Sequence, residues 1–240
     1  YKFPFWVAGI LGLISTVVAW RFLPHDEDEL FKSETKNPEN ELLTGGWSQL
    51  KQIMTPILIT LFGMIFVASF GLAGFESIYS LYVNEVHNFD LNAIALVLTL
   101  NGIISLILQV FFFDRLVRWL GEVRLMRYSF FLSLVGTIMV IYDHNHWHII
   151  IATLFVFEAF DMLRPTITTL LTKMSKTNQG LLNGVNMSLT SVGNIIGPLI
   201  SGYLLDVNYQ YPYWFVSIFL IISWVITLVL GRERKAAAND

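Results

Sequence analysis

The chain contains no cysteine, so it has neither a disulfide framework nor a thiolate for catalysis or metal binding. Charge is also scarce, because charged residues make up only 14% of its 240 residues, against about 25% in an average soluble domain. The 15 basic and 18 acidic side chains give a formal net charge of −3, which offers no basic surface to nucleic acid. Cysteine chemistry and nucleic-acid partners are therefore excluded.

Hydrophobic residues account for 55% of the chain, and its mean hydropathy is +0.60. Such a composition is typical of proteins that lie in a lipid bilayer, where a crossing helix needs about 20 mostly apolar residues. We expect an all-α membrane protein. A window of this length finds seven candidate spans, at 4–23, 56–83, 91–113, 125–142, 147–171, 181–205 and 212–230.

Lysine and arginine gather on alternate connections between these spans, and the intervening connections contain none. By the positive-inside rule, the C-terminus is then cytoplasmic and the N-terminus lies outside. We predict four parts: a first helix at 1–23, a polar and acidic cytoplasmic loop at 24–52, a six-helix bundle at 53–231 and a cytoplasmic tail at 232–240. Because the chain starts at Tyr1 and turns hydrophobic at once, we expect a fragment of a longer protein.

Charged residues inside the predicted spans are the main candidates for a functional site, since each costs about 2.5–3.5 kcal/mol at the centre of a bilayer. Glu76 is the only charge between Ile57 and Tyr82, and near the outer end of its helix it could bind and release a proton. Its alternative is a structural hydrogen bond to a neighbouring helix.

Glu158, Asp161 and Arg164 are three residues apart and should follow one face of one helix. Asp161 and Arg164 can form an ion pair that keeps Asp161 ionised, and the like charge of Asp161 would push Glu158 toward its neutral form. Glu158 could add a second titrating group or favour cations. The alternative for all three is a purely structural cluster, and Pro165 just after them could kink the helix.

Uncharged polar and aromatic side chains near these charges could line a cavity for flat cationic molecules, or could simply pack and bond between helices. The polar candidates are Gln109, Asn186 and Asn194, and the aromatic ones are Phe157, Phe160 and Tyr79. The last six spans also form two triplets with similar polar residues and opposite orientation, as in transporters built from inverted repeats.

Four stretches resemble one known family: AGFESIYSLY (73–82), FFFDRLVRWLGE (111–122), FDMLRPTIT (160–168) and GNIIGPLISGYLLDV (193–207). They are similar to the C-terminal half of major facilitator superfamily drug–proton antiporters, above all the NorA-type quinolone and multidrug efflux pumps. The resemblance implies helices six to twelve of that fold, meaning a C-terminal six-helix bundle with the helix before it. It also implies a missing N-terminal helical bundle as partner.

The resemblance further implies proton-coupled efflux of amphipathic, often cationic drugs across the bacterial plasma membrane by alternating access, with Glu76 and Asp161 coupling protons. It places Arg164 and Asn194 at the cavity, Asp114 and Arg115 in a cytoplasmic loop motif, and Gly197 and Pro198 in a gating motif. Such a transporter is not an enzyme and needs no cofactor or metal.

Two other functions stay open: a superfamily transporter of one specific metabolite, and a seven-helix receptor, which the absent cysteine and the long first loop disfavour. A zinc site on the loop of Asp143, His144, His146 and His148 is a weaker alternative to an ordinary exposed loop.

Overall fold

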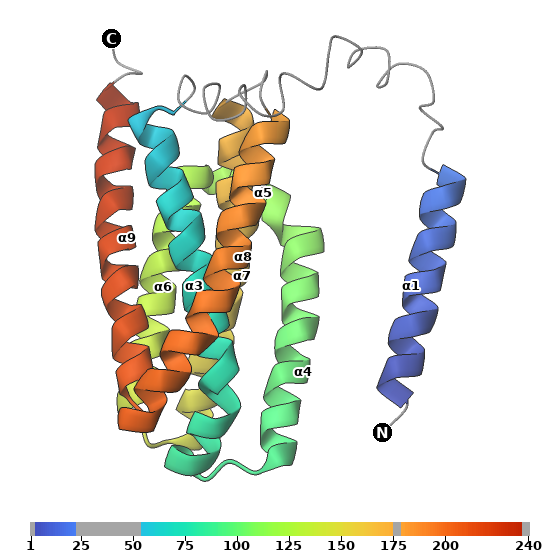
Figure 1. The fold of residues 1–240 in the computed structure, drawn as a ribbon, viewed down its shortest axis with the longest axis vertical. Helices are drawn as coiled ribbons and strands as arrows, with labels where there is room; N and C mark the ends of the chain where they lie inside the picture. Colours follow the sequence, from blue (N-terminus) through green and yellow to red (C-terminus); the bar gives the residue numbers. More distant parts are fainter. Residues whose placement is uncertain (1–2, 23–53, 175–178, 237–240) are drawn as a thin grey trace. The chain divides into compact units, whose positions relative to one another are not determined.

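The computed structural model describes residues 3–22, 54–174 and 179–236, and the chain divides into two units (Figure 1). The first unit, Tyr1–Ile53, contributes one described helix, α1 (Phe3–Phe22). The second unit, Met54–Asp240, is a helical bundle, and no strand occurs in the described ranges of either unit. The predicted loop at 24–52 falls outside the described residues.

Six helical rods make up the described part of the second unit. They are α3 (Pro56–His87); α4 (Leu91–Ile107), which continues through the π-helical turn η1 (Leu108–Phe112) into α5 (Phe113–Leu120); α6 (Glu122–Tyr142); α7 (His146–Met174); α8 (Gln179–Val207); and α9 (Tyr211–Ala236). Each of the seven predicted spans coincides with a helix. The predicted tail at 232–240 starts inside α9, which continues to Ala236.

Five of the described helices are long and apolar enough to cross a membrane: α3, the rod from α4 to α5, α6, α8 and α9. A shorter apolar segment, Gly9–Arg21, lies in α1. α7 is not among the five, and it is the helix that carries three charged residues in its middle. The fold is that of an all-α, multi-pass membrane protein.

Local sequence sets several helix ends in the second unit. The Thr55 side chain caps α3, with Pro56 at the first helical position, and the Asp90 side chain accepts a hydrogen bond from the Ala93 amide at 2.9 Å to start α4. Gly121 separates α5 from α6 with a φ of +75°, a backbone conformation that side chains with a Cβ rarely adopt. The predicted loop motif is therefore helical up to this glycine.

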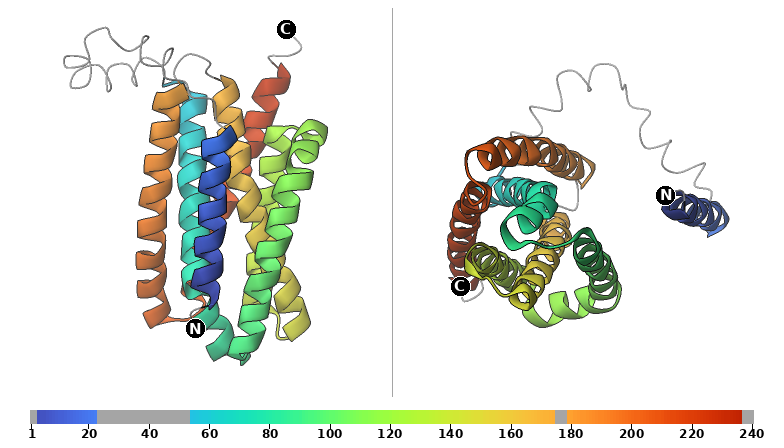
Figure 2. Two further views of the ribbon diagram at one scale, coloured as in Figure 1. Left: turned by 90° about the vertical axis from the view of Figure 1, so that its right-hand side faces the viewer. Right: turned by 90° about the horizontal axis from the view of Figure 1, so that it is seen from below.

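Seen along the bundle, α3 and α7 occupy the middle, with α8, α9, α6 and α4 around them (Figure 2). α3 and α8 make the closest approach. A Cβ added to Gly197 of α8 would come within 2.6 Å of the Phe70 carbonyl oxygen on α3, and one added to Gly193 would come within 2.9 Å of the Phe70 amide nitrogen. These α8 glycines therefore pack against the backbone of α3, since small residues let helix backbones meet in lipid.

Candidate functional site

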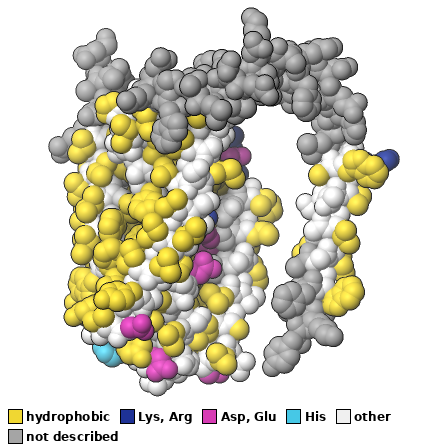
Figure 3. Space-filling view, in the orientation of Figure 1, with side chains coloured by type: hydrophobic (Ala, Val, Ile, Leu, Met, Phe, Trp, Pro, Cys, Tyr) yellow, Lys and Arg dark blue, Asp and Glu magenta, His cyan; other side chains and the backbone are white. Residues whose placement is uncertain are grey.

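Two of the site residues predicted from the sequence lie near the middle of their helices. Asp161 is in the middle of α7, and Asn194 is in the middle of α8. Acidic and basic side chains are visible between the surfaces of α8 and α4 on a face that is otherwise mostly uncharged (Figure 3). Ser105 is hydrogen-bonded to Asp161 and Arg164 to Asn194, and with exposed Glu76 of α3 these five residues are the candidate site, which we call the polar face.

Asp161 is half-buried and points toward α4. The Ser105 hydroxyl donates a hydrogen bond to its Oδ2 atom at 2.8 Å, and the Gln109 side-chain amide donates to the Ser105 oxygen at 2.9 Å. Together they form a chain from Gln109 in η1 through Ser105 to the carboxylate. Such a donor favours the ionised form of Asp161.

Arg164 is one turn further along α7 and points toward α8 and α3. Its guanidinium donates to the Asn194 side-chain oxygen at 2.9 Å and, more weakly, to the Ser69 hydroxyl at 3.4 Å. The predicted role of Asn194 in this face is consistent with that contact. One side chain of α7 therefore links α8 to α3.

The predicted ion pair between Asp161 and Arg164 is wrong for this conformation. Among the described residues, the ion pairs are His148 with Asp143 and Lys173 with Glu122. A step of three residues turns a helix by about 300°, so each step rotates the side chain by roughly 60° around the helix. Asp161 therefore reaches α4 while Arg164 reaches α8, although Arg164 still acts on Asp161 electrostatically.

Glu76 is exposed on α3, and it has no hydrogen bond or ion pair to any described residue. α3 continues to His87, eleven residues beyond Glu76, which places the carboxylate roughly 16 Å from the end of its helix at about 1.5 Å per residue. The sequence placed it nearer the outer end. The structure thus leaves Glu76 without the structural hydrogen bond that was its alternative role.

The predicted aromatic residues lie in the core of the bundle. Phe157 stacks edge-on against Phe75 and Tyr79, with ring centroids 5.4 and 5.6 Å apart, and Phe160 packs against Gly71 of α3. All of these side chains are buried. Their role in binding stays a prediction that this packing does not favour.

Other predicted residues are spread over the bundle. Asn186 donates to the Thr168 hydroxyl at 3.0 Å, so it bonds α8 to α7 away from Asp161. Asp114 and Arg115 are exposed at the start of α5. Pro198 interrupts the hydrogen bonding of α8 as Pro165 does in α7, and both helices nevertheless continue. Because proline has no N–H, the carbonyls four residues earlier, those of Asp161 and Asn194, lose their usual helical donor.

Sequence reasoning missed Ser105 and Ser69. Ser105 lies four residues from both Asn101 and Gln109, so a polar stripe on α4 was the available signal. A lone serine in an apolar helix usually bonds its own backbone, as Ser188 does with the Gly184 carbonyl. The position of Ser105 on the polar stripe of α4 was therefore a better indicator of its role in the site than its residue type.

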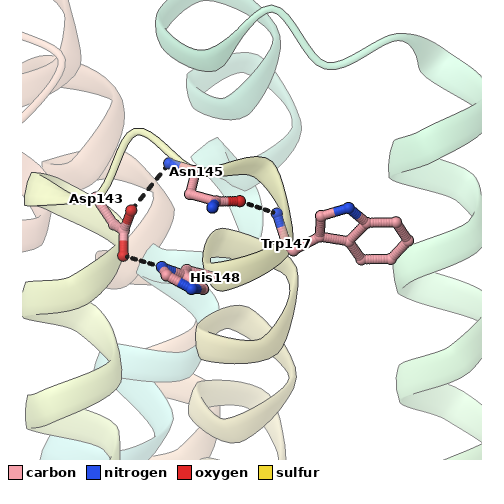
Figure 4. Close-up of polar contacts among 4 residues, drawn as sticks. All are labelled: Asp143, Asn145, Trp147 and His148. Atoms are coloured by element: carbon pink, nitrogen blue, oxygen red, sulfur yellow. Dashed lines mark hydrogen bonds and ion pairs between the residues drawn. The ribbon is translucent and has the colours of Figure 1, made fainter.

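The histidine loop between α6 and α7 forms a helix cap (Figure 4). The Asp143 carboxylate accepts from the Asn145 amide and bonds the His148 ring, each at 2.9 Å, and the Asn145 side chain accepts from the Trp147 amide at 3.0 Å. The hydrogen bond from the Asn145 amide is the main cause that holds the pKa of Asp143 below its ordinary value, and the His148 hydrogen bond lowers this pKa further. No group of three or more metal-ligating side chains is present in the described ranges.

Comparison with known proteins gives the family. The sequence model of the Major Facilitator Superfamily matches residues 1–142 and residues 61–240. The chain is 35% identical over 238 residues to multidrug resistance protein 1 of Bacillus subtilis (strain 168), which covers 99% of this chain and 59% of that protein. It is 32% identical over 241 residues to quinolone resistance protein NorA of Staphylococcus aureus (strain COL), covering 100% and 60%.

The chain spans about three fifths of the length of these curated relatives. The family match agrees with the resemblance carried by the four stretches and excludes the seven-helix receptor. From the matched ranges and the all-helical fold, the chain belongs to the Major Facilitator Superfamily of membrane transporters.

Proposed function

We propose that this chain forms part of a proton-coupled exporter of amphipathic, often cationic compounds. The observation that carries the proposal is the polar face, where a membrane bundle holds two carboxylates, exposed Glu76 and half-buried Asp161, together with the Arg164–Asn194 bond. Intramembrane ionisable groups are costly and usually mark ion pathways. The named activity of the relatives, resistance to multiple drugs and to quinolones, supports drugs as the cargo.

The mechanism is alternating access with no covalent step. A proton that binds Asp161 neutralises the negative charge that the Ser105 hydroxyl stabilises. A proton that binds Glu76 neutralises the carboxylate of this face that has no described partner. Either event changes the charge seen by a cationic compound and biases the bundle between two arrangements. The membrane potential supplies about 2.3 kcal/mol per charge per 100 mV, which can drive export when proton entry is coupled to it.

The orientation follows from charge. We propose that the C-terminal end of α9 and the basic segment around α5 lie on the cytoplasmic side of the bacterial plasma membrane, because positive residues are retained there. The loops between α3 and α4 and between α6 and α7 then lie outside. The remaining part of the cavity would come from helices outside this chain.

The test uses dye efflux driven by a proton gradient in cells that carry the full-length protein. Glu76→Gln and Asp161→Asn keep side-chain size and remove the titratable proton, so each should abolish gradient-dependent efflux while surface expression persists. Glu85→Gln, on an exposed carboxylate near the end of α3, is the matched control and should transport normally. Unchanged efflux in both site variants would contradict the proposal.

A further inference from the structure

Among the described residues of the second unit, Glu158 is the one carboxylate that is buried without a described partner. Its side chain is only 7% exposed, and neither of its oxygens has a hydrogen-bond partner among the described residues. An ionised carboxylate in such a place keeps the full cost of losing its water, because no donor or cation offsets it. The protonated form loses far less, so burial favours a neutral Glu158.

The charges around Glu158 also favour its neutral form. Its charged neighbour is Asp161 on the same helix, a like charge. α4 has no titratable residue between Leu91 and Phe113, and α8 has none between Gln179 and Leu205 except Tyr203 near its end. From α3 the titratable groups at this level are Tyr79 and exposed Glu76, and the charges of α6, Glu122, Arg124 and Arg127, lie near its other end.

α4 offers a matching group at the level of Glu158. The Ser105–Asp161 hydrogen bond fixes the register of α4 against α7, and both helices run in the same direction through the bundle (Figure 1). One turn back along each helix brings Asn101 to the level of Glu158. Asn101 is on the inward stripe of α4 with Ile94, Val97 and Ser105, and its Oδ1 atom is buried without a described partner.

In the described orientation of the Asn101 amide, the buried atom without a described partner is the oxygen, which is a hydrogen-bond acceptor. An ionised carboxylate and an amide oxygen are both acceptors and cannot bond each other, whereas a protonated carboxyl supplies the O–H donor that the amide oxygen lacks. A single proton would therefore satisfy two unpartnered buried groups at once.

We propose that Glu158 is an additional proton-binding residue, which carries a proton in this conformation and pairs with the Asn101 side chain across the contact between α4 and α7. When α4 moves away from α7, water reaches the carboxyl group and takes the proton. The bound proton thus stabilises the closed contact. Protonation of Glu158 does not depend on the cargo, whereas its use in transport rests on the proposed function.

Infrared spectroscopy of the purified full-length protein tests the protonation directly. Near neutral pH, the wild type should show a carbonyl stretch from a protonated carboxylic acid that is absent in Glu158→Gln and present in Glu76→Gln. Asn101→Leu should shift this band, because the O–H group loses its acceptor. The proposal is overturned if wild type and Glu158→Gln show the same spectrum in the carboxylic acid region.

Thermal unfolding provides a second measurement that requires neither spectral assignment nor transport. A buried group that is protonated in the folded state contributes stability that is lost as the pH rises through its folded-state pKa. The wild-type melting temperature should therefore fall relative to that of Glu158→Gln between mildly acidic and mildly alkaline pH. Parallel pH profiles of the melting temperature in the wild type and Glu158→Gln would refute the proposal. If only the coupling of dye efflux to the proton gradient were lost, that result would bear on the proposed function and not on the protonation of Glu158.

Discussion

Asp161 and Arg164 are one turn apart on α7, yet they bind different helices: Asp161 accepts from Ser105 of α4, and Arg164 donates to Asn194 of α8. Opposite charges so close in sequence would neutralise each other if they paired. If Asp161 exchanges a proton as proposed, it therefore does so without releasing the arginine. The two contacts can therefore be tested independently.

The Arg164–Asn194 contact should contribute measurable coupling between α7 and α8. In a double-mutant cycle of Arg164→Ala and Asn194→Ala, we expect a coupling of about 1 kcal/mol, in the range of a hydrogen bond that involves a charged group at a partly exposed site. Chemical unfolding of the full-length protein in detergent measures it. Arg118→Ala, on an exposed arginine of α5, should be additive with Asn194→Ala. Additivity in the Arg164 pair as well would show that the contact is absent in solution.

Ser105→Ala should move the pH dependence of transport. The serine hydroxyl stabilises the ionised form of Asp161, so its loss favours the protonated form, and the pH midpoint of efflux should rise. Initial rates of dye efflux across a pH series measure the shift. Ser188→Ala, which removes a hydroxyl bonded to its own helix, should leave the midpoint unchanged. Equal midpoints for Ser105→Ala and the wild type would contradict the role given to Ser105.

Gly197→Ala should destabilise the second unit. The new Cβ would stand 2.6 Å from the Phe70 carbonyl oxygen and 3.0 Å from the Gly74 nitrogen, and both are backbone atoms that cannot rotate away. Overpacking of this kind costs about 1–3 kcal/mol. The melting temperature in detergent should fall, whereas Gly184→Ala on the same helix, where a Cβ meets nothing within 4 Å, should not lower it. A wild-type melting temperature in Gly197→Ala would mean that α3 and α8 are further apart.

The helices of this bundle could be predicted from sequence because length and hydropathy decide them. Even the shortest of the seven predicted spans, 125–142, is part of a helix, α6. The partners of the charged residues could not be predicted in the same way, because they depend on how each helix is rotated about its own axis. Asp161 illustrates this point, since sequence spacing favoured Arg164 while the packed bundle brings it to Ser105.

The surroundings of the aromatic residues were also difficult to predict from the sequence. Phe157 and Tyr79 lie close to the charges in sequence, which suggested a binding role, but they stack on one another inside the bundle. Hydropathy identifies such residues as apolar without saying whether they face lipid, a cavity or the core. The glycines of α8 differ in this respect, because small residues on a membrane helix permit close backbone contact, which Gly193 and Gly197 make with α3.

The interlocked backbones of α3 and α8 restrict how this half of a transporter can change shape. At Gly193 and Gly197 the two helices meet through backbone atoms and the small side chains of Ser69 and Ala73, which leaves little to repack, so we expect α3 and α8 to move together. Glu76 and Asn194 would then keep a constant separation through a transport cycle, while α4 would move relative to α7 once the Ser105–Asp161 hydrogen bond breaks. Spin-label distances that stay fixed between α3 and α8 but vary between α4 and α7 would support this expectation.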